Sequence, residues 1–118
     1  MPVLARNKKA FHDYFIEDKL EAGIELVGTE VKSVKAGKVS IKESFIRIIK
    51  NEVFIMNMHV TPYEFGNINN LPETRVRKLL LNRKEIEKWA AKIKEQGYTI
   101  MPLSIYTKQR LVKMEIGL

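Results

Sequence analysis

Cysteine is absent from the 118 residues of this sequence. Disulfide bonds, thiol catalysis and cysteine zinc sites are therefore excluded. Long apolar runs are also lacking, and no segment approaches the roughly 20 residues that a membrane-spanning helix needs. The N-terminus places Arg6, Lys8 and Lys9 after a short apolar stretch, which reverses the order found in a secretory signal. We therefore expect a cytoplasmic protein with no membrane partner.

Acidic residues are outnumbered, because Asp and Glu total 14 while Lys and Arg total 21, a formal net charge of +7. Such a surplus favours a polyanionic partner such as nucleic acid. The alternative is a soluble protein that is merely basic. A hydrophobic content of 45% with 30% charged residues is typical of a globular domain. No repeat, low-complexity block or linker divides the chain, so we predict a single domain over residues 1–118.

The clearest helix is predicted between Asn82 and Gly97. Asn82 is a good N-cap, and Glu85 three residues later completes a capping box. Gly97 provides a stop signal. Between them, one apolar stripe with helical spacing is formed by Ile86, Trp89, Ala90 and Ile93. A shorter helix of one to two turns is predicted within residues 28–37, which glycines bracket.

Strands are predicted for most of the remaining chain. Residues 44–60 have the pattern of a hairpin that turns at Lys50-Asn51. The other predicted segments are a mobile basic arm at about 1–10, an extended run from His12 to Val27, a polar loop at 62–75, a strand at 98–106 with an edge or bulge at Pro102, a turn at 108–110 and a strand at 112–118. About six strands and two helices favour a mainly β fold. We expect a small antiparallel OB-like β-barrel with flanking helices, an architecture that commonly binds oligonucleotides.

A basic cluster formed by Arg75, Arg77 and Lys78 is the strongest candidate for phosphate contact, because guanidinium groups match phosphate oxygens bidentately. The alternative is a solvated, charged turn. Exposed aromatic side chains stack on unpaired bases, and the candidates for this role are Tyr63, Phe65, Tyr98 and Tyr106. Core packing is the more common fate of each of these aromatic rings.

Glu30-Val31-Lys32 has the Glu-x-Lys form found in metal-dependent nucleases, in which an upstream carboxylate such as Asp13 or Asp18 completes a cation site. However, this triplet lies in the predicted short helix and not on a strand. The two histidines, His12 and His59, have no metal-ligand spacing. We find no catalytic constellation and predict a protein that is not an enzyme and that uses no cofactor or metal.

Six segments in the same order together resemble the small protein B (SsrA-binding, tmRNA-binding) family. They are Glu21-Ala-Gly23-Ile24, Gly28-Thr-Glu-Val-Lys-Ser33, Arg75-x-Arg77-Lys78-Leu-Leu-Leu81, Glu85-Ile86, Gly97-Tyr98-Thr99 and Pro102-Leu-Ser-Ile-Tyr106. The resemblance covers the chain from about Asn7 to Leu118. It implies an OB-like barrel flanked by helices, and RNA-facing positions that match Glu21, Leu80, Asn82 and Lys113 in this sequence.

The function implied by the resemblance is binding to the tRNA-like domain of tmRNA, near its elbow, and entry with it into stalled ribosomes for trans-translation. Alanyl-tRNA synthetase and elongation factor Tu are indirect partners, and the protein is expected to be a monomer. A generic single-stranded nucleic-acid-binding OB protein is the alternative. Family members continue into a basic C-terminal tail, whereas this sequence ends at Gly117-Leu118. We accordingly expect RNA binding without support for peptide tagging. Leu71-Pro72-Glu73 also departs from the family's His-Asp-Pro type sequence before the basic cluster.

Overall fold

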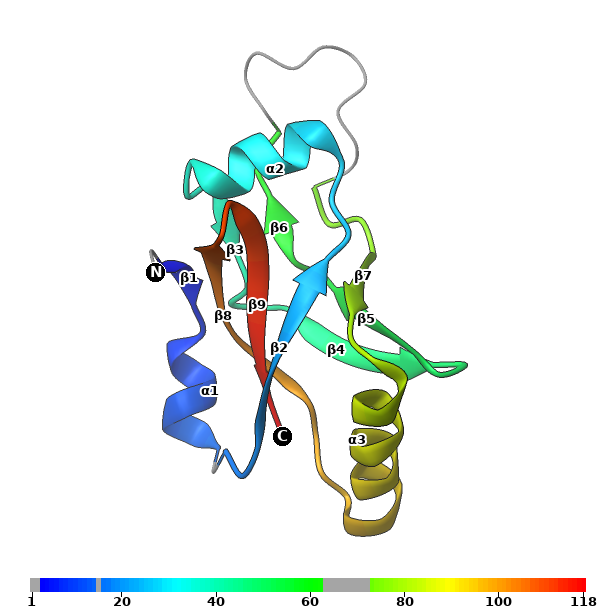
Figure 1. Cartoon of the computed structure of the whole chain (residues 1–118). Helices are drawn as coiled ribbons and strands as arrows, with labels where there is room; N and C mark the ends of the chain where they lie inside the picture. Colours follow the sequence, from blue (N-terminus) through cyan, green and yellow to red (C-terminus); the bar gives the residue numbers. More distant parts are fainter. Residues whose placement is uncertain (1–2, 15, 63–72) are drawn as a thin grey trace.

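A computed structural model describes residues 3–14, 16–62 and 73–118 of the chain. In this described part the chain forms three helices and nine strands (Figure 1). In chain order they are β1 (Val3–Arg6), α1 (Lys8–Asp13), β2 (Lys19–Ile24), α2 (Gly28–Lys35), β3 (Val39–Ser40), β4 (Phe45–Ile49), β5 (Glu52–Met56), β6 (His59–Val60), β7 (Arg77–Leu80), α3 (Arg83–Gln96), β8 (Met101–Lys108) and β9 (Leu111–Gly117).

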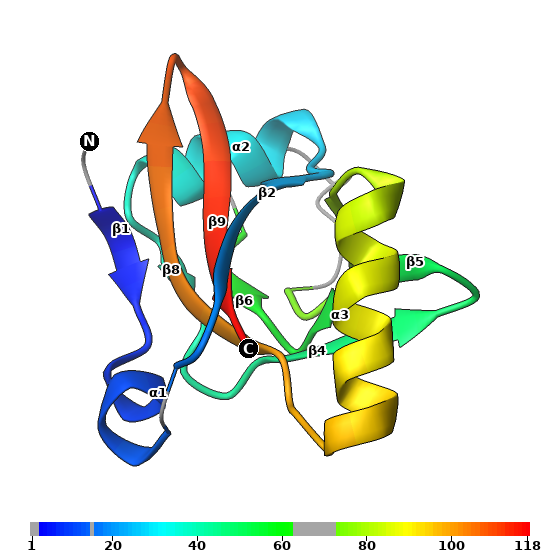
Figure 2. The same ribbon diagram turned by 60° about the horizontal axis from the view of Figure 1, so that its bottom comes forward.

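Seven of these strands form one antiparallel sheet in the order β1-β8-β9-β2-β7-β5-β4, and β3 pairs with β6 in a second, two-stranded sheet. The predicted mainly β, antiparallel fold with flanking helices is confirmed. The predicted barrel is not, because β1 and β4 are the two edges of a sheet that does not close. Figures 1 and 2 show the three helices at the periphery of the strongly curved sheet.

The C-terminal strand shows how the sheet encloses the core. Val112, Met114 and Ile116 are at most 9% exposed, whereas Lys113 and Glu115 between them are half-buried on the opposite face. This is the predicted alternation of apolar and polar residues, because successive side chains of a strand point to opposite faces. One face of the sheet therefore packs into the core, and the other remains accessible.

Helix α3 confirms the predicted helix between Asn82 and Gly97. The Asn82 side chain accepts a hydrogen bond from the Glu85 backbone N–H at 3.0 Å, and the Glu85 carboxylate accepts one from the Asn82 N–H at 3.3 Å. Gly97 ends the helix with a left-handed φ of 69°. The helix buries Trp89 and Ile86, and the Trp89 indole donates to Asp18 at 3.1 Å. The shorter predicted helix is α2.

Both predicted turns are confirmed. Lys50 and Asn51 join β4 to β5 with φ values of 50° and 64°, and Gln109 and Arg110 join β8 to β9 with 51° and 68°. Two consecutive positive φ values match the twist of the flanking strands in a two-residue hairpin.

The pairing of β8 with β9 is irregular between Pro102 and Ser104. This confirms the bulge interpretation of Pro102, while β8 itself is an interior strand.

The N-terminal predictions are wrong in two respects. The basic arm is not a free segment, because β1 pairs with β8 and residues 8–13 are helical. The extended run begins later than His12, at β2. Asn7 explains the difference: it is 3% exposed, its Oδ1 accepts from the Ala10 N–H at 3.3 Å, and its Nδ2 donates to the Pro102 carbonyl at 3.0 Å. Most of the predicted loop at 62–75 lies outside the described residues.

Candidate nucleic-acid interface

Strand register brings three of the predicted RNA-facing residues to one side of the sheet. In the pairing of β2 with β9, Glu21 lies opposite Glu115 and Gly23 lies opposite Lys113. Gly23 is also opposite Leu80 of β7. Directly opposed residues of an antiparallel pair project to the same face, as do residues two apart in a strand. Glu21, Lys113 and Leu80 therefore share the face that points away from the core, here called the outer face.

The outer face continues onto β8, where Tyr106 lies opposite Lys113 and Lys108 follows two residues later. The intervening residues confirm this assignment, because Ala22, Met114, Leu79 and Ile105 are at most 1% exposed and belong to the core. The outer face is therefore built from β7, β2, β9 and β8, four neighbouring strands of which only β8 and β9 follow each other in the sequence (Figure 1).

Glu21 is tied to β8 by two side chains. The Tyr106 hydroxyl donates a hydrogen bond to Glu21 Oε2, and Lys108 Nζ lies 3.4 Å from Glu21 Oε1. The hydrogen bond from Tyr106, assisted by the charges of Lys108 and Lys113, lowers the pKa of Glu21 against the opposing effect of partial burial. The Glu21 side chain is 36% exposed, so an ionised carboxylate faces solvent at the centre of the outer face.

Leu80 stands beside Glu21 as an exposed apolar side chain, 49% accessible. It packs over Gly23, where an added Cβ would lie 3.3 Å from the Leu80 Cβ. The pairing of β2 with β9 continues through Gly23 without a register shift. Gly23 therefore allows the Leu80 side chain to approach the backbone closely, and it does not form a bulge. Leu80 also borders a groove that Lys78, Arg83 and Ile86 help to line.

Asn82 follows at the junction of β7 with α3. Its side-chain oxygen is used by the helix cap, which does not require the two N–H donors of the amide. Lys78 lies two residues before Leu80 on the same face of β7 and forms an ion pair of 3.4 Å with Glu52. This pair is at the surface, where such contacts contribute little and are readily exchanged. Both residues thus remain available at the rim of the outer face.

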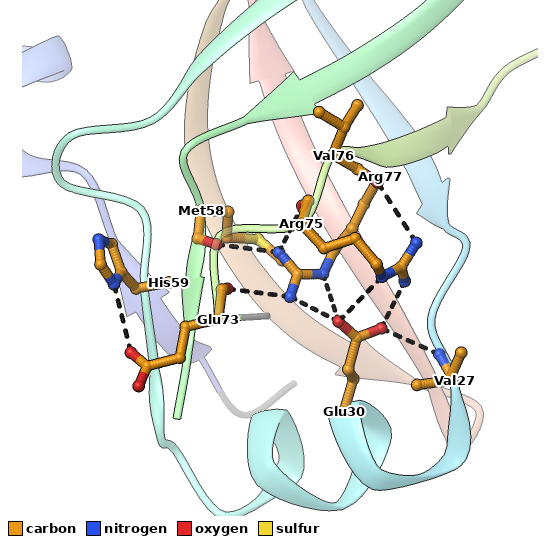
Figure 3. Close-up of polar contacts among 8 residues, drawn as sticks. All are labelled: Val27, Glu30, Met58, His59, Glu73, Arg75, Val76 and Arg77. Carbon is orange, nitrogen blue, oxygen red and sulfur yellow. Dashed lines mark hydrogen bonds and ion pairs between the residues drawn. The ribbon is translucent and has the colours of Figure 1, made fainter. Parts of the chain in front are cut away.

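The other two members of the basic cluster have a different role (Figure 3). Arg77 is 0% exposed. Its Nε and Nη2 donate to Glu30 Oε2 at 2.8 and 2.5 Å, and its Nη1 donates to the Met58 carbonyl at 2.9 Å. Arg75 Nη2 donates to the other oxygen, Oε1, at 2.5 Å. The Val27 N–H donates to the same oxygen at 3.0 Å. Glu30, Arg75 and Arg77 are called the buried ion cluster below.

The buried ion cluster corrects the prediction that Arg77 contacts phosphate, because its guanidinium is enclosed and its donors are used internally. Arg75, with a side chain 29% exposed, reaches the surface only at its edge. The cluster also gives Glu30 a structural role in place of the nuclease alternative. Burial alone would raise the pKa of Glu30, but Arg75, the Val27 N–H and Arg77 together hold that pKa below its ordinary value. In the described part of the chain, no three His, Asp or Glu side chains gather as metal ligands would.

The aromatic candidates have separate outcomes. Tyr106 lies on the outer face but is only 8% exposed. Tyr98 packs against the core. Tyr63 and Phe65 lie outside the described residues. Sequence reasoning did not identify Tyr106 and Lys108 as partners of Glu21, although their spacing of two in a strand already places both on one face.

The fold and the outer face together define a small, basic, mainly β protein whose accessible sheet surface combines a carboxylate, lysines and an exposed leucine. The family model for SmpB protein matches residues 4–118. The chain belongs to this family.

Individual relatives agree with the family match. An SsrA-binding protein of Fusobacterium nucleatum subsp. nucleatum is 62% identical over 116 residues, 98% of this chain and 78% of that protein. One of Caldanaerobacter subterraneus subsp. tengcongensis is 56% identical over 115 residues, 98% of this chain and 73% of that protein. A solved chain, described as tmRNA-SmpB on a journey to the center of the bacterial ribosome, has a TM-score of 0.79 and 44% identity, and the match covers 100% of this chain and 82% of that one.

Within the described ranges, none of the helices has the length and apolar character required to cross a membrane.

Proposed function

We propose that this chain binds the tRNA-like domain of tmRNA through its outer face and accompanies it to stalled ribosomes in trans-translation. The main support for the proposal is the strand register, which places Glu21, Leu80 and Lys113 on one accessible face. The relatives named SsrA-binding proteins and the solved tmRNA-SmpB chain support it. The formal net charge of +7 supplies the general attraction that RNA binding requires.

The outer face offers a different contact at each position. Lys113 is placed to pair with a phosphate oxygen. Leu80 presents an apolar surface against which an unstacked base can pack, and Glu21 accepts hydrogen bonds from base amino groups or ribose 2′-hydroxyls. Such a mixture recognises a folded loop with splayed bases, because a surface built only to neutralise phosphates would contain no carboxylate. Asn82, Lys78 and the exposed edge of Arg75 extend this surface toward α3 and β7.

Within the same proposal, the chain acts by binding and not by catalysis. It acts as a monomer in the cytoplasm, on the ribosome. Alanyl-tRNA synthetase, which charges the RNA, and elongation factor Tu, which delivers it, are indirect partners through the shared RNA. Arg77 takes no part in RNA contact, because its guanidinium donates its hydrogen bonds inside the protein, to Glu30 and to the Met58 carbonyl. Arg77 instead ties the start of β7 to Glu30 of α2 and to the Met58 carbonyl.

Binding to three RNAs across a salt series tests the proposal: a tmRNA tRNA-like domain, an elongator tRNA and an unstructured RNA. We expect clear preference for the tmRNA domain and a negative slope of log affinity against log salt. Lys113→Ala should weaken that binding and reduce the slope by about one. Glu21→Gln should weaken binding without reducing the slope, because it removes a negative charge and leaves the positive charges of the protein in place.

Matched control variants lie on the last turn of α3. Lys94→Ala and Glu95→Gln make the same changes of charge at exposed positions of that helix, and both should bind like the unsubstituted chain. Equal binding to all three RNAs, with Glu21→Gln and Lys113→Ala no weaker than their controls, would instead indicate a generic single-strand binder. In that case the outer face would have to be abandoned as the recognition site.

A further inference from the structure

The carboxylate at the centre of the outer face is held by side chains that come from a strand not adjacent to its own. Glu21 is on β2, Tyr106 and Lys108 are on β8, and β9 lies between the two strands. The Tyr106 hydroxyl donates to Glu21 Oε2, while Lys108 Nζ is 3.4 Å from Oε1. Lys108 Nζ is also 3.5 Å from Oε2, so Tyr106 binds one oxygen while Lys108 lies near both, and together they restrict the orientation of the carboxylate.

Tyr106 is suited to this task because its ring cannot move freely. Only 8% of the residue is exposed. Burial, together with the smaller effect of the hydrogen bond to Glu21, raises the pKa of Tyr106. Its hydroxyl thus remains protonated and acts as the donor to Glu21. A glutamate on an exposed sheet face otherwise samples many rotamers, and ordering it on binding RNA costs free energy. The contact with Tyr106 removes part of that cost before RNA arrives.

We propose that Tyr106, assisted by Lys108, is a positioning residue that presents Glu21 as a fixed, ionised hydrogen-bond acceptor to the donor groups of a folded RNA. This inference rests on the proposed function, because it assumes that Glu21 contacts RNA. Each carboxylate oxygen has more than one acceptor direction, so the bond from Tyr106 leaves Glu21 able to accept from a 2′-hydroxyl or a base amino group. A phosphate is repelled by the same carboxylate, and the arrangement therefore favours shape-specific recognition over general backbone binding.

Tyr106→Phe is the decisive variant, because it removes a single hydroxyl and keeps the buried ring. Binding of the tmRNA tRNA-like domain and of unstructured RNA is measured for the unsubstituted chain, Tyr106→Phe, Glu21→Gln and the double variant, from about pH 4.5 to pH 7.5. Tyr98→Phe is the matched control, since a carboxylate, that of Glu17, also interacts with the Tyr98 hydroxyl and raises the pKa of Tyr98. Thermal unfolding of each variant establishes that the fold is retained.

We expect Tyr106→Phe to weaken binding of the tmRNA domain by about tenfold, in the range of a lost hydrogen bond to a charged group. Binding of unstructured RNA and the behaviour of Tyr98→Phe should be unchanged. Because the hydroxyl holds the pKa of Glu21 down, its removal should move the acid loss of binding to higher pH. In the Glu21→Gln background Tyr106→Phe should have little further effect.

Two results would overturn the inference while leaving the proposed function in place. One is normal binding and a normal pH profile for Tyr106→Phe when Glu21→Gln binds weakly. The other is an undiminished effect of Tyr106→Phe in the Glu21→Gln background, since Tyr106 would then act without Glu21. If Glu21→Gln itself binds like the unsubstituted chain, the recognition site under the proposed function fails, and the positioning role fails with it.

Discussion

Glu21 and Glu30 are two glutamates with a lowered pKa in opposite surroundings. The Glu30 side chain is 6% exposed and is bound by two guanidinium groups. The Glu21 side chain is 36% exposed and is bound by one hydroxyl and, more loosely, one lysine. Glu30 therefore has its acceptor capacity used inside the protein, whereas Glu21 retains capacity toward solvent. The difference shows that a residue's place in the fold, more than its charge, decides which ionic residues can meet a ligand.

Glu30→Gln should have the largest effect on stability. It leaves the fully buried Arg77 guanidinium without its counter-ion, and breaking a buried pair in this way costs about 3–5 kcal/mol in the free energy of unfolding. Urea unfolding followed by circular dichroism measures the change. Glu21→Gln is the matched control, because the same substitution on the outer face should move the unfolding temperature by no more than about 2–3 °C. Similar losses for the two variants would remove the distinction between the two sites.

Removing both charges of the buried pair sharpens the comparison. Arg77→Met alone leaves Glu30 with only Arg75 and the Val27 N–H as donors, so it should also be strongly destabilising. The double variant Glu30→Gln/Arg77→Met should be more stable than the sum of the two single effects predicts, by at least about 1 kcal/mol. A double-mutant cycle on the free energy of unfolding tests this. Strict additivity would mean that the buried ion cluster is not an energetic unit.

Acid stability follows from the lowered pKa of Glu30. The unfolded chain binds a proton at a higher pH than the folded chain does, so this contribution is fully present above the ordinary carboxylate pKa. It is lost as the pH falls through the lower, folded value. Glu30→Gln should therefore flatten the acid side of the curve of unfolding free energy against pH. An unchanged slope in the Glu30→Gln variant would contradict the account of Glu30.

Gly23→Ala should have the smallest effect on stability and a visible effect on binding. The new Cβ would lie 3.3 Å from the Leu80 Cβ, so Leu80 must shift, which lowers stability. Replacing the flexible glycine has the opposite effect, because it stabilises the strand. These opposing effects should keep the net change within about 1 kcal/mol. Binding of the tmRNA domain should weaken because Leu80 is displaced. Gly28→Ala is the control, since an added Cβ there meets nothing within 4 Å; equal binding by both variants would remove the role given to Gly23.

Local signals in the sequence were sufficient where structure is decided locally. The capping box from Asn82 to Glu85 predicted the start of α3, and the dipeptides at 50–51 and 109–110 coincide with turns whose positive φ values are typical of short hairpins. The closure of the sheet was not predictable in this way. It depends on whether the edge strands β1 and β4 pair with each other, which they do not, and no local pattern reports that.

The candidate site shows the same division. The alternation of Arg77 with Lys78 and of Leu79 with Leu80 already implied that Arg77 shares the inward face with Leu79. Its partner Glu30, 47 residues away, could not be found from spacing, so a buried ion pair was taken for a phosphate contact. The link between Glu21 and Tyr106 spans 85 residues and was missed for the same reason. Long-range pairing of polar side chains is set by register, which sequence alone leaves open.

The most direct test of the account measures RNA binding and unfolding on the same two variants, Glu21→Gln and Glu30→Gln. We predict that Glu21→Gln keeps its unfolding temperature and loses affinity and preference for the tmRNA tRNA-like domain. Glu30→Gln should lose stability, yet bind that RNA normally at a temperature where it remains folded. The reverse pattern, with normal binding by Glu21→Gln and impaired binding by folded Glu30→Gln, would contradict the assignment of recognition to the outer face.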